Sequence, residues 1–331
     1  MITGKYPNLR LRRSRKQDWS RRLIQENRLS SNDLILPLFL MDGKNAKKPI
    51  KSMPDVYRYT VDKLGSIIEK AIDYKIPMIA LFPATDKKNK DEFGSEALNE
   101  NNIICRAITY VKKRYKNEIG IMCDVALDPY TTHGHDGLLK SGYVLNDETV
   151  EILVKQSILH AEMGCDVIAP SDMMDGRIGR IRKGLDANGH QMTQILSYAV
   201  KYASSFYGPF RDAVGSKDAL IGNKKNYQMN IGNSDEALRE VSLDIKEGAD
   251  MVMIKPGLPY LDIIKQVKDN FKIPVLAYQV SGEYSLIKNG IKNRIINEDT
   301  ILESLISFKR AGASAIVTYF ALNMANKFKN I

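Results

Sequence analysis

The sequence predicts a (β/α)8 TIM barrel preceded by an N-terminal arm. The chain has 331 residues, of which 44% are hydrophobic, so it can bury one large core. Short, continuously apolar runs alternate with segments of helical periodicity, which is typical of parallel strands covered on both faces. Eight such runs follow residues 1–30 within about 300 residues, the number of strands and the approximate length of that barrel.

The apolar runs also argue against the main alternative, a doubly wound open sheet. In that fold a glycine-rich phosphate turn commonly follows the first strand. Here the first run continues into MDGKNAKKP (41–49), which has no such turn. The predicted strands are LILPLFL (34–40), MIALFP (78–83), IGIMCDVAL (119–127), DVIAPS (166–171), ILSYAVKYA (195–203), MVMIKP (251–256), PVLAYQV (274–280) and AIVTYF (315–320).

Helical periodicity fills the segments between these strands. Asp235 and Glu236 stand at the start of one such segment, where negative charge favours a helix N-terminus. Pro259 stands in the first turn of another, a position that tolerates its missing N–H. Three predicted helices are 147–164, 234–248 and 259–270, and the predicted domains are the arm, 1–30, and the barrel, 31–331.

One connection is unusually long. About 30 residues with little periodicity separate Ala203 from Ser234, and a loop of this length in a compact domain is usually functional. We expect it to act as a lid over the site.

The net charge of +10 restricts the classes of partner. Its basic excess is dense only between Arg10 and Arg28, and no aromatic side chains interleave with it as in a base-stacking surface. We therefore expect no nucleic-acid partner. An arm that packs on another subunit, or anionic small substrates, explains the charge better.

The cysteines and the hydropathy indicate a cytoplasmic protein. Cys105, Cys123 and Cys165 are too few for a disulfide framework and lack metal-type spacing, so a reducing compartment is expected. No run approaches the ~18 apolar residues of a membrane helix. The first residues contain no apolar signal-peptide core, and we expect no membrane partner.

Two lysines lie in predicted strands. Lys201 shares a face with Ala199, and Lys255 ends a strand after Met251 and Met253. A lysine in an apolar strand is unusual because burying its charge is costly. Either side chain could instead extend to solvent or pair with a carboxylate. Two on consecutive strands predict one shared site at the C-terminal mouth of the barrel.

Such a pair of lysines has a chemical use. A lysine amine attacks a ketone only when it is neutral, and its ordinary pKa is about 10.4. An apolar pocket and a second ammonium group both lower that pKa. The two lysines therefore predict Schiff-base chemistry with carbonyl substrates.

Polar residues follow the third and fourth predicted strands. Those in CDVALDPYTTHGHDG (123–137) are metal-ligand types, but the carboxylates could equally pair with Lys or Arg. APSDMMDGRIG (169–179) adds polar groups at what would be the barrel mouth. The candidates are Asp124, Asp128, Asp136, His133 and His135 in the first loop, and Ser171, Asp172, Asp175 and Arg177 in the second.

Glu240 and Asp244 are four residues apart on one predicted helix. Like charges at that spacing repel, which favours a cation or an arginine as partner. A plain solvated face explains these two residues equally well.

Several longer strings show a resemblance to one family. The chain resembles the δ-aminolevulinic acid dehydratases, or porphobilinogen synthases, over essentially its whole length. The resemblance implies a TIM barrel whose arm wraps a neighbouring subunit, usually in an octamer. The strings are DVALDPYTTHGHDG (124–137), APSDMMDGRIG (169–179), YASSFYGPFRDA (202–213), VMIKPGLPYLDII (252–264), YQVSGEY (278–284) and TYFA (318–321).

The resemblance implies the condensation of two 5-aminolevulinate molecules to porphobilinogen, with loss of two waters, in tetrapyrrole (haem) biosynthesis. Lys255 and Lys201 match the Schiff-base lysines of the propionate-side and acetate-side substrates. Arg211, Lys224 and Gln228 match the acetate-side carboxylate site, and Ser281 and Tyr319 the propionate-side one; Tyr207 and Phe210 match pocket walls, and Asp124, Ser171 and Asp172 match polar residues near the lysines.

The resemblance also implies a particular metal requirement. Zinc-dependent members carry three cysteines where this chain has Ala126, Asp128 and Asp136, so no zinc is expected. Asp128 and Asp136 are of the types that would hold another active-site cation. The chain resembles the cysteine-free branch with an allosteric Mg²⁺ site and no organic cofactor. There Glu240 matches the metal ligand, and Asp244, Asp175 and Arg10 match its water-bridged network.

Two other functions compete with this one. A class I aldolase on the same barrel would need neither a second lysine nor a carboxylate-binding lid, and both are predicted here. A catalytically inactive barrel, acting as an assembly or nucleic-acid partner, would be expected to have lost one of the lysines. Both lysines are retained.

Overall fold

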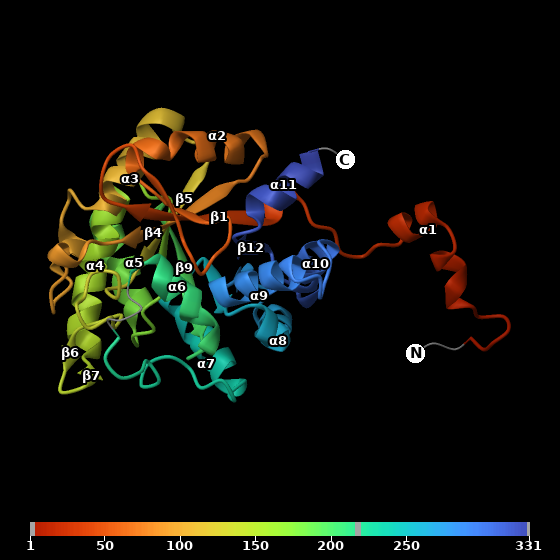
Figure 1. Cartoon of the computed structure of the whole chain (residues 1–331). Coiled ribbons are helices and arrows are strands. Elements are labelled where there is room, and N and C mark those ends of the chain that lie inside the picture. The colour runs from red at the N-terminus through yellow and green to blue at the C-terminus, as the bar shows by residue number, and fades with distance from the viewer. Residues whose placement is uncertain (1–3, 216–219, 330–331) are drawn as a thin grey trace.

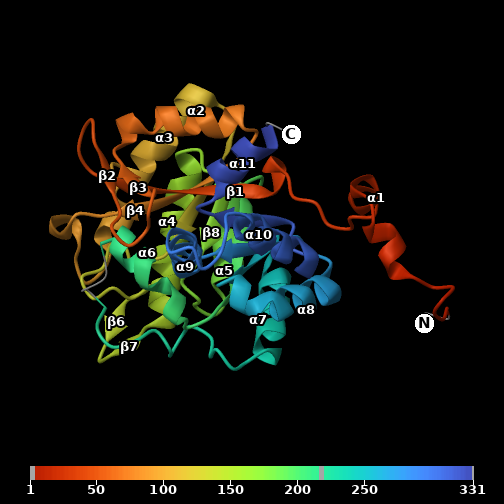
Figure 2. The same ribbon diagram turned by 45° about the vertical axis from the view of Figure 1, so that its right-hand side comes forward.

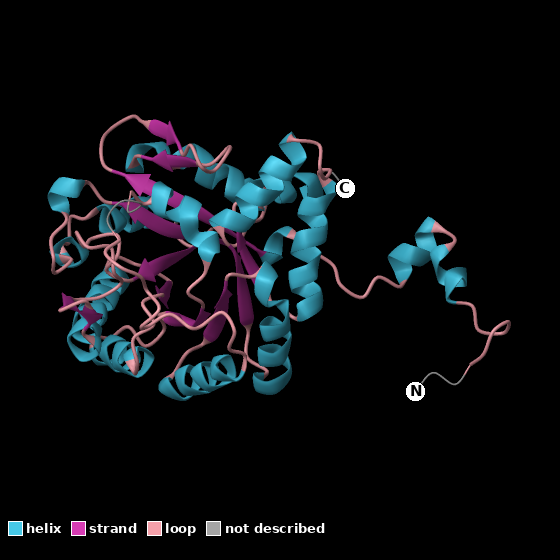
Figure 3. Ribbon diagram, turned by 60° about the horizontal axis from the view of Figure 1, so that its bottom comes forward, coloured by secondary structure: helices cyan, strands magenta, loops and turns pink. Residues whose placement is uncertain are grey.

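The computed structural model describes residues 4–215 and 220–329, and it confirms the predicted barrel. Eight parallel strands pair in sequence order, and β12 closes the sheet by pairing with β1 (Figures 1 and 3). The strands are β1 (Leu34–Met41), β4 (Met78–Ala84), β5 (Gly120–Val125), β8 (Val167–Pro170), β9 (Gln194–Lys201), β10 (Met251–Lys255), β11 (Val275–Gln279) and β12 (Ala315–Thr318).

Helices surround the strands, as the alternating pattern predicts. The predicted helices at 147–164 and 234–248 are confirmed as α4 and α7. The one expected at 259–270 begins later, because Pro259 lies in a separate 3-10 turn, Leu258–Tyr260. The helices are α2 (Gly65–Asp73), α3 (Ile103–Tyr115), α4 (Asn146–Glu162), α5 (Arg177–Ala187), α7 (Asp235–Glu247), α8 (Leu261–Phe271), α9 (Ser281–Lys292), α10 (Asp299–Ala311) and α11 (Ala321–Lys329).

The core lies between the strands and these helices. All eight residues of β1 are buried, which explains its continuously apolar sequence. Burying each large aliphatic side chain contributes roughly 1.5–3 kcal/mol to folding. Helix ends are set by local chemistry: α7 ends at Gly248, whose φ of 106° suits glycine. None of the described helices has the length and apolar character needed to cross a bilayer.

Several short elements escape sequence prediction. They are two to five residues long, too short for a periodic pattern to emerge. They include two pairs of strands, of which β3 also extends the sheet beside β1. The strands are β2 (Lys47–Pro49), β3 (Tyr57–Tyr59), β6 (Leu139–Lys140) and β7 (Tyr143–Val144); the 3-10 turns are η2 (Ser31–Asp33), η3 (Val61–Lys63), η4 (Lys87–Asn89) and η5 (Ser95–Leu98).

The long connection after β9 is partly helical, contrary to its aperiodic sequence. It contains η6 (Ser205–Tyr207) and α6 (Gly208–Ala213), and α6 packs against α9. The hydroxyl of Ser204 accepts a hydrogen bond from the Phe206 N–H and so fixes the start of η6. Residues 216–219 of this predicted lid lie outside the described residues.

The arm lies apart from the barrel. Residues 4–30 contain η1 (Leu11–Arg15) and α1 (Asp18–Leu23), which project away from the closed sheet in both views (Figures 1 and 2). Neither element has a buried residue. Trp19 and Leu23 are 62% and 72% exposed. The arm therefore presents apolar side chains without a core of its own. Residues 1–3 lie outside the described part of the chain.

Candidate active site

Lys201 and Lys255 end neighbouring strands of the barrel. They are partners in the parallel register of β9 and β10, so their side chains leave the sheet side by side at its C-terminal mouth. Strand β9 ends at Lys201 rather than continuing to residue 203 as predicted. Both side chains are buried, with 5% and 6% exposed. The structure thus brings the two predicted lysines into one site.

An irregularity in β9 adds a residue to this site. From the pair Ser197–Val252 to the pair Val200–Ile254, β9 advances three residues while β10 advances two. Such a bulge resets the alternation of side chains between the two faces. Tyr198 and Lys201 therefore both face the mouth, although strict alternation would place them on opposite faces.

Four aromatic rings surround the ammonium group of Lys255. Its Nζ lies 5.1 Å from the ring centroid of Tyr198, 5.5 Å from Tyr207, 5.1 Å from Phe210 and 4.9 Å from Tyr278. Burial, followed by the positive charge of Lys201, lowers the pKa of Lys255 to about 7. Two of these rings, Tyr207 and Phe210, are the pocket walls expected from the sequence. The other two, Tyr198 from β9 and Tyr278 from β11, are residues that the sequence reasoning missed.

Lys201 contacts the loops after β5 and β8. Its Nζ donates hydrogen bonds to Asp136 Oδ1, at 3.0 Å, and to the carbonyl of Ser171. Asp136 Oδ2 lies 2.7 Å from Lys224 Nζ and accepts a 2.8 Å hydrogen bond from the Tyr227 hydroxyl. Burial alone would raise the pKa of Asp136, but Lys201 and Lys224 outweigh it and hold this pKa below its usual range.

Lys224 has a second carboxylate beside it. Its Nζ lies 3.4 Å from Asp128 Oδ2. Burial alone would lower the pKa of Lys224, but Asp128 and Asp136 outweigh burial and raise it. The carboxylates of this loop therefore pair with lysines, one of the two arrangements that the sequence left open. Lys201 and Lys224 already supply the positive charge that a metal ion would bring to this position.

Two further carboxylates near the lysines differ in their contacts. Asp124 Oδ1 is buried without a hydrogen-bond partner, and burial raises the pKa of Asp124 to about 6 although Lys255 and Lys201 oppose the shift. Asp172 Oδ1 accepts a 2.7 Å hydrogen bond from the Met174 N–H. Burial also raises the pKa of Asp172 to about 6. Each carboxylate thus has one buried oxygen without a hydrogen bond, but that of Asp172 lies 3.5 Å from Arg177 Nε, whereas Asp124 forms no ion pair among the described residues.

The residues expected to bind carboxylates form two groups. Arg211, Lys224 and Gln228 line a pocket of about 240 Å³ formed by residues of the long connection itself. In the other group, Ser281 Oγ accepts a 2.8 Å hydrogen bond from the Phe210 N–H. The hydroxyl of Tyr319 lies 3.1 Å from that of Tyr278, one of the rings around Lys255.

Glu283 is a buried residue that the sequence reasoning did not single out. Its carboxylate accepts hydrogen bonds from the N–H groups of Leu258, at 2.6 Å, and Val280. It thereby joins the segment after Lys255 to the start of α9, which carries Ser281. Burial raises the pKa of Glu283 to about 8. A glutamate at the first turn of a helix, three residues after Val280, is a recognisable capping signal.

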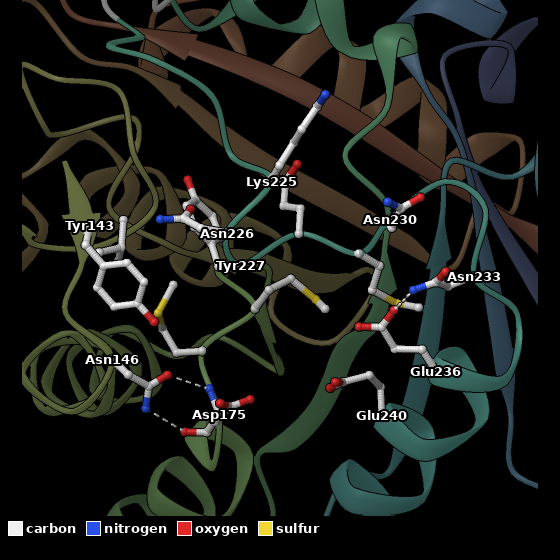
Figure 4. A pocket seen from close by; sticks show the side chains of 15 residues that line it. Tyr143, Asn146, Asp175, Lys225, Asn226, Tyr227, Asn230, Asn233, Glu236 and Glu240 are labelled. Carbon is white, nitrogen blue, oxygen red and sulfur yellow. Dashed lines mark hydrogen bonds between the residues drawn. The ribbon is translucent and has the colours of Figure 1, made fainter.

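A separate pocket of about 310 Å³ contains Glu240 (Figure 4). Asp175 and Glu236 also line it, and Figure 4 shows Asp175 and Glu240 at the same end. Asn146 fixes Asp175 by hydrogen bonds to its backbone N–H, at 2.7 Å, and carbonyl, at 3.1 Å. Burial raises the pKa of Glu240 to about 7, with Asp244 and Asp175 adding to the shift and Arg177 opposing it.

The other two residues expected around Glu240 lie elsewhere in this chain. Asp244 is a buried residue of α7, where it accepts a hydrogen bond from Ser197 and lies 3.5 Å from Arg177. Its neighbour is thus an arginine, one of the two partners that the spacing favours. Arg10 lies on the arm, with its guanidinium 4.5 Å from the ring centroid of Tyr6.

The acidic pocket suits a hydrated ion better than a directly bound one. Among the described residues, no three His, Cys, Asp or Glu side chains are arranged to hold a metal ion. Mg²⁺ commonly keeps several of its waters and takes few protein ligands. The carboxylates and amide side chains of this pocket are the oxygen donors that such an ion prefers. The described cysteines are buried free thiols.

Comparison with known proteins gives one consistent result. The family profile of delta-aminolevulinic acid dehydratase matches residues 8–327. The enzyme of that name from Bradyrhizobium diazoefficiens is 56% identical over 97% of this chain and 91% of its own length. The one from Archaeoglobus fulgidus is 46% identical over 98% and 100%. The Toxoplasma gondii enzyme, solved with its product porphobilinogen, superimposes with a TM-score of 0.94 at 45% identity, covering 96% of this chain and 91% of that one.

Proposed function

The chain belongs to the delta-aminolevulinic acid dehydratase family, and from this premise we propose that Lys255 and Lys201 each form a Schiff base with one 5-aminolevulinate. The hydro-lyase reaction joins two substrates into porphobilinogen and releases two waters. One observation carries the proposal: the two buried lysines are register partners on adjacent strands. Two ketone substrates condensed with each other need two such amines side by side.

Lys255 is suited to make the first covalent bond. With a pKa lowered to about 7, a large fraction of its amine is neutral at physiological pH and can attack a ketone carbon. The attack forms a C–N bond, and loss of the carbonyl oxygen as water leaves the imine. The four rings around Nζ keep the site apolar. Lys201 supplies the second amine and, through its charge, helps to keep the first one neutral.

Asp124 is the residue placed to transfer protons. Its unpartnered Oδ1 and its pKa of about 6 allow it to give a proton to a departing water and to take one from a substrate carbon. Ser171 supports it by a side-chain hydrogen bond. We assign Asp172 a positioning role, because one of its oxygens accepts a hydrogen bond from the Met174 N–H and the other lies 3.5 Å from Arg177 Nε.

Charged and hydroxyl side chains are proposed to recognise the substrate carboxylates. Arg211 and Lys224, with Gln228, line the pocket formed by the long connection and would hold the acetate-side carboxylate. The hydroxyls of Ser281 and Tyr319 would hold the propionate-side carboxylate. Both lie next to rings that contact Lys255. Each substrate would then be held at its carboxylate and at its ketone, which fixes its orientation.

The Glu240 pocket supports a second part of the proposal, an allosteric Mg²⁺. Glu240, Glu236 and Asp175 bring negative charge to one pocket. A hydrated Mg²⁺ would offset this charge, and Glu240 with Asp175 would hold it through few direct bonds. Its role there is electrostatic and structural, since the pocket contains neither Schiff-base lysine. No zinc requirement is proposed.

The exposed arm supports an oligomeric enzyme, which we propose to be an octamer. Trp19 and Leu23 are mostly exposed on a segment with no buried residue. Packing them on a second copy would remove that apolar surface from water. Arg10 would then reach the Glu240 pocket of a neighbouring subunit rather than its own. Free cysteines agree with a cytoplasmic location.

Incubation with 5-aminolevulinate, followed by a colour reaction for pyrroles, tests the function directly. Borohydride reduction during turnover should leave substrate-derived adducts on Lys255 and Lys201, located by peptide mass spectrometry. Lys265→Ala, which removes a solvent-exposed lysine on α8, is the control and should leave product and adducts unchanged. Absence of the pyrrole with the parent protein would contradict the function. Pyrrole formation without any lysine adduct would contradict the proposed mechanism alone.

A further inference from the structure

The imidazole of His135 lies between the loop after β5 and residues 220–228 of the long connection, which we call the lid segment. The side chain is buried, with 2% exposed. Its Nε2 lies 2.7 Å from the carbonyl oxygen of Ile221. Because a carbonyl oxygen can only accept, Nε2 carries the proton and donates this bond. Its Nδ1 lies 3.1 Å from the hydroxyl of Tyr227. Both ring nitrogens thus contact the lid segment.

Tyr227 continues this chain of contacts to the active site. Its hydroxyl has a single proton, which faces two acceptors, Asp136 Oδ2 at 2.8 Å and His135 Nδ1 at 3.1 Å, and its oxygen accepts a 3.3 Å hydrogen bond from the Asp136 N–H. Asp136 is the carboxylate that contacts Lys201 at 3.0 Å and Lys224 at 2.7 Å. A continuous path of polar contacts therefore runs from His135 through Tyr227 and Asp136 to Lys201 and Lys224.

His133 holds the backbone of His135 in place. Its Nδ1 accepts a 3.2 Å hydrogen bond from the backbone N–H of His135, and its Nε2 lies 3.2 Å from the carbonyl oxygen of Glu92. The carbonyl of His133 also accepts a 3.2 Å bond from the N–H of Ile221. The lid segment is thus attached at Ile221 by backbone and side-chain bonds, and at Tyr227 by side-chain bonds.

We propose that His135 and Tyr227 are positioning residues that latch the lid segment onto the barrel and thereby hold Lys224 at the carboxylate-binding pocket. The proposal deepens the proposed function, because it assigns Lys224 its substrate role from that function. Lys224 lies between the two latch points in sequence, three residues after Ile221 and three before Tyr227. With both neighbours fixed, its ammonium group can exchange Asp128, now 3.4 Å away, for a substrate carboxylate without leaving the site.

A latch that positions Lys224 should affect substrate binding more than the chemical steps at Lys255. In the described part of the chain, neither Lys255 nor any of the four rings around it hydrogen-bonds to His135 or Tyr227, so the first amine should remain competent without the latch. Loss of the latch should therefore raise the KM for 5-aminolevulinate more than it lowers kcat. It should also expose the backbone amides of the lid segment to exchange.

The test compares His135→Leu, His135→Gln and Tyr227→Phe with the parent protein. His135→Leu, which removes both ring contacts, should raise KM by about tenfold or more, with kcat changed by less than about threefold. Deuterium uptake of residues 220–228 should increase. His135→Gln keeps an N–H for the Ile221 carbonyl and should recover most of the parent KM. Tyr227→Phe keeps the ring and should resemble His135→Leu.

Tyr202→Phe is the matched control. Its hydroxyl donates a 2.7 Å hydrogen bond to the Asn233 carbonyl, beyond the lid segment, so neither KM nor uptake at 220–228 should change. Parent-like KM and uptake in Tyr227→Phe would overturn the proposal, whether or not His135→Leu folds. A fall in kcat with unchanged KM and uptake would overturn it as well. If the parent made no porphobilinogen, the proposed function would fail, while the uptake measurements would still test the latch.

Discussion

The mouth of the barrel and the Glu240 pocket each hold a group whose pKa lies near 7, and they reach that value from opposite directions. At the mouth, burial and the charge of Lys201 lower the pKa of Lys255. At the Glu240 pocket, which we also call the outer pocket, burial and the charges of Asp244 and Asp175 raise the pKa of Glu240. In both places a buried group is destabilised in its charged form, and a neighbour of like charge adds to the effect.

The two regions differ in how their charges are balanced. At the mouth, Asp136 lies between Lys201 and Lys224, so opposite charges meet directly. At the Glu240 pocket, no cationic partner of Glu240 lies within ion-pair distance among the described residues, because Arg177 is engaged with Asp172 and Asp244 and only partly opposes the pKa shift of Glu240. The difference agrees with the two proposals, a neutral amine at the mouth and a bound cation in the Glu240 pocket. The following predictions test that contrast.

The largest effect is expected for Lys255→Ala. Because the first Schiff base should form at this amine, the variant should lose borohydride trapping of substrate at both lysines. Porphobilinogen formation should fall by roughly three orders of magnitude or more. Peptide mass spectrometry and the pyrrole assay check these outcomes, with Lys265→Ala as the control. Wild-type-like turnover would contradict the assignment of Lys255.

A smaller but more diagnostic effect is expected for Lys201→Met. Substrate should still be trapped on Lys255, but almost no product should form. Because the charge of Lys201 lowers the pKa of Lys255, its removal should raise that pKa. More of the amine would then be protonated at pH 7, so the trapping rate should fall there and recover at higher pH. The trapping rate measured against pH checks the shift, and an unchanged profile would show that the two amines are not electrostatically linked.

At the outer pocket we expect a regulatory effect of Glu240→Ala. Parent activity should rise with Mg²⁺, and the assembly should shift toward the larger oligomer, because an ion that binds the assembled form preferentially stabilises it. The variant should lose this response while substrate trapping at Lys255 and Lys201 persists. Activity and sedimentation against Mg²⁺ concentration measure it, with Glu303→Ala, an exposed residue of α10, as control. A Mg²⁺ response retained in Glu240→Ala would refute the site.

The smallest effect is expected from removing zinc. The loop offers no thiolate at Ala126, Asp128 or Asp136. The carboxylates of Asp128 and Asp136 lie 3.4 Å and 2.7 Å from Lys224 Nζ. Dialysis against a zinc-selective chelator, with Mg²⁺ supplied afterwards, should leave the pyrrole-forming activity unchanged. Activity that is lost and then restored by stoichiometric zinc, but not by Mg²⁺, would show that this reading of the loop is wrong.

The sequence alone determined the barrel and the two lysines. Each strand appears as a local apolar run, and each of the three helices named from the sequence has its own periodic pattern. Lys201 and Lys255 stand out because a charged residue interrupts such a run at a strand end. The length of the connection after β9 predicts a lid, although α6 within it is too short to leave a periodic pattern.

The tertiary structure decided which side chains meet. Asp136 and Lys201 are 65 residues apart, and His135 and Tyr227 are 92 apart, so no local pattern links them. The bulge that turns Tyr198 toward Lys255 depends on the register between two strands rather than on β9 alone. Likewise, only packing of α7 on the sheet placed Asp244 against Arg177 while leaving Glu240 in a pocket. Periodicity is a property of neighbouring residues, whereas contacts across the mouth arise only when the eight strands close into a barrel.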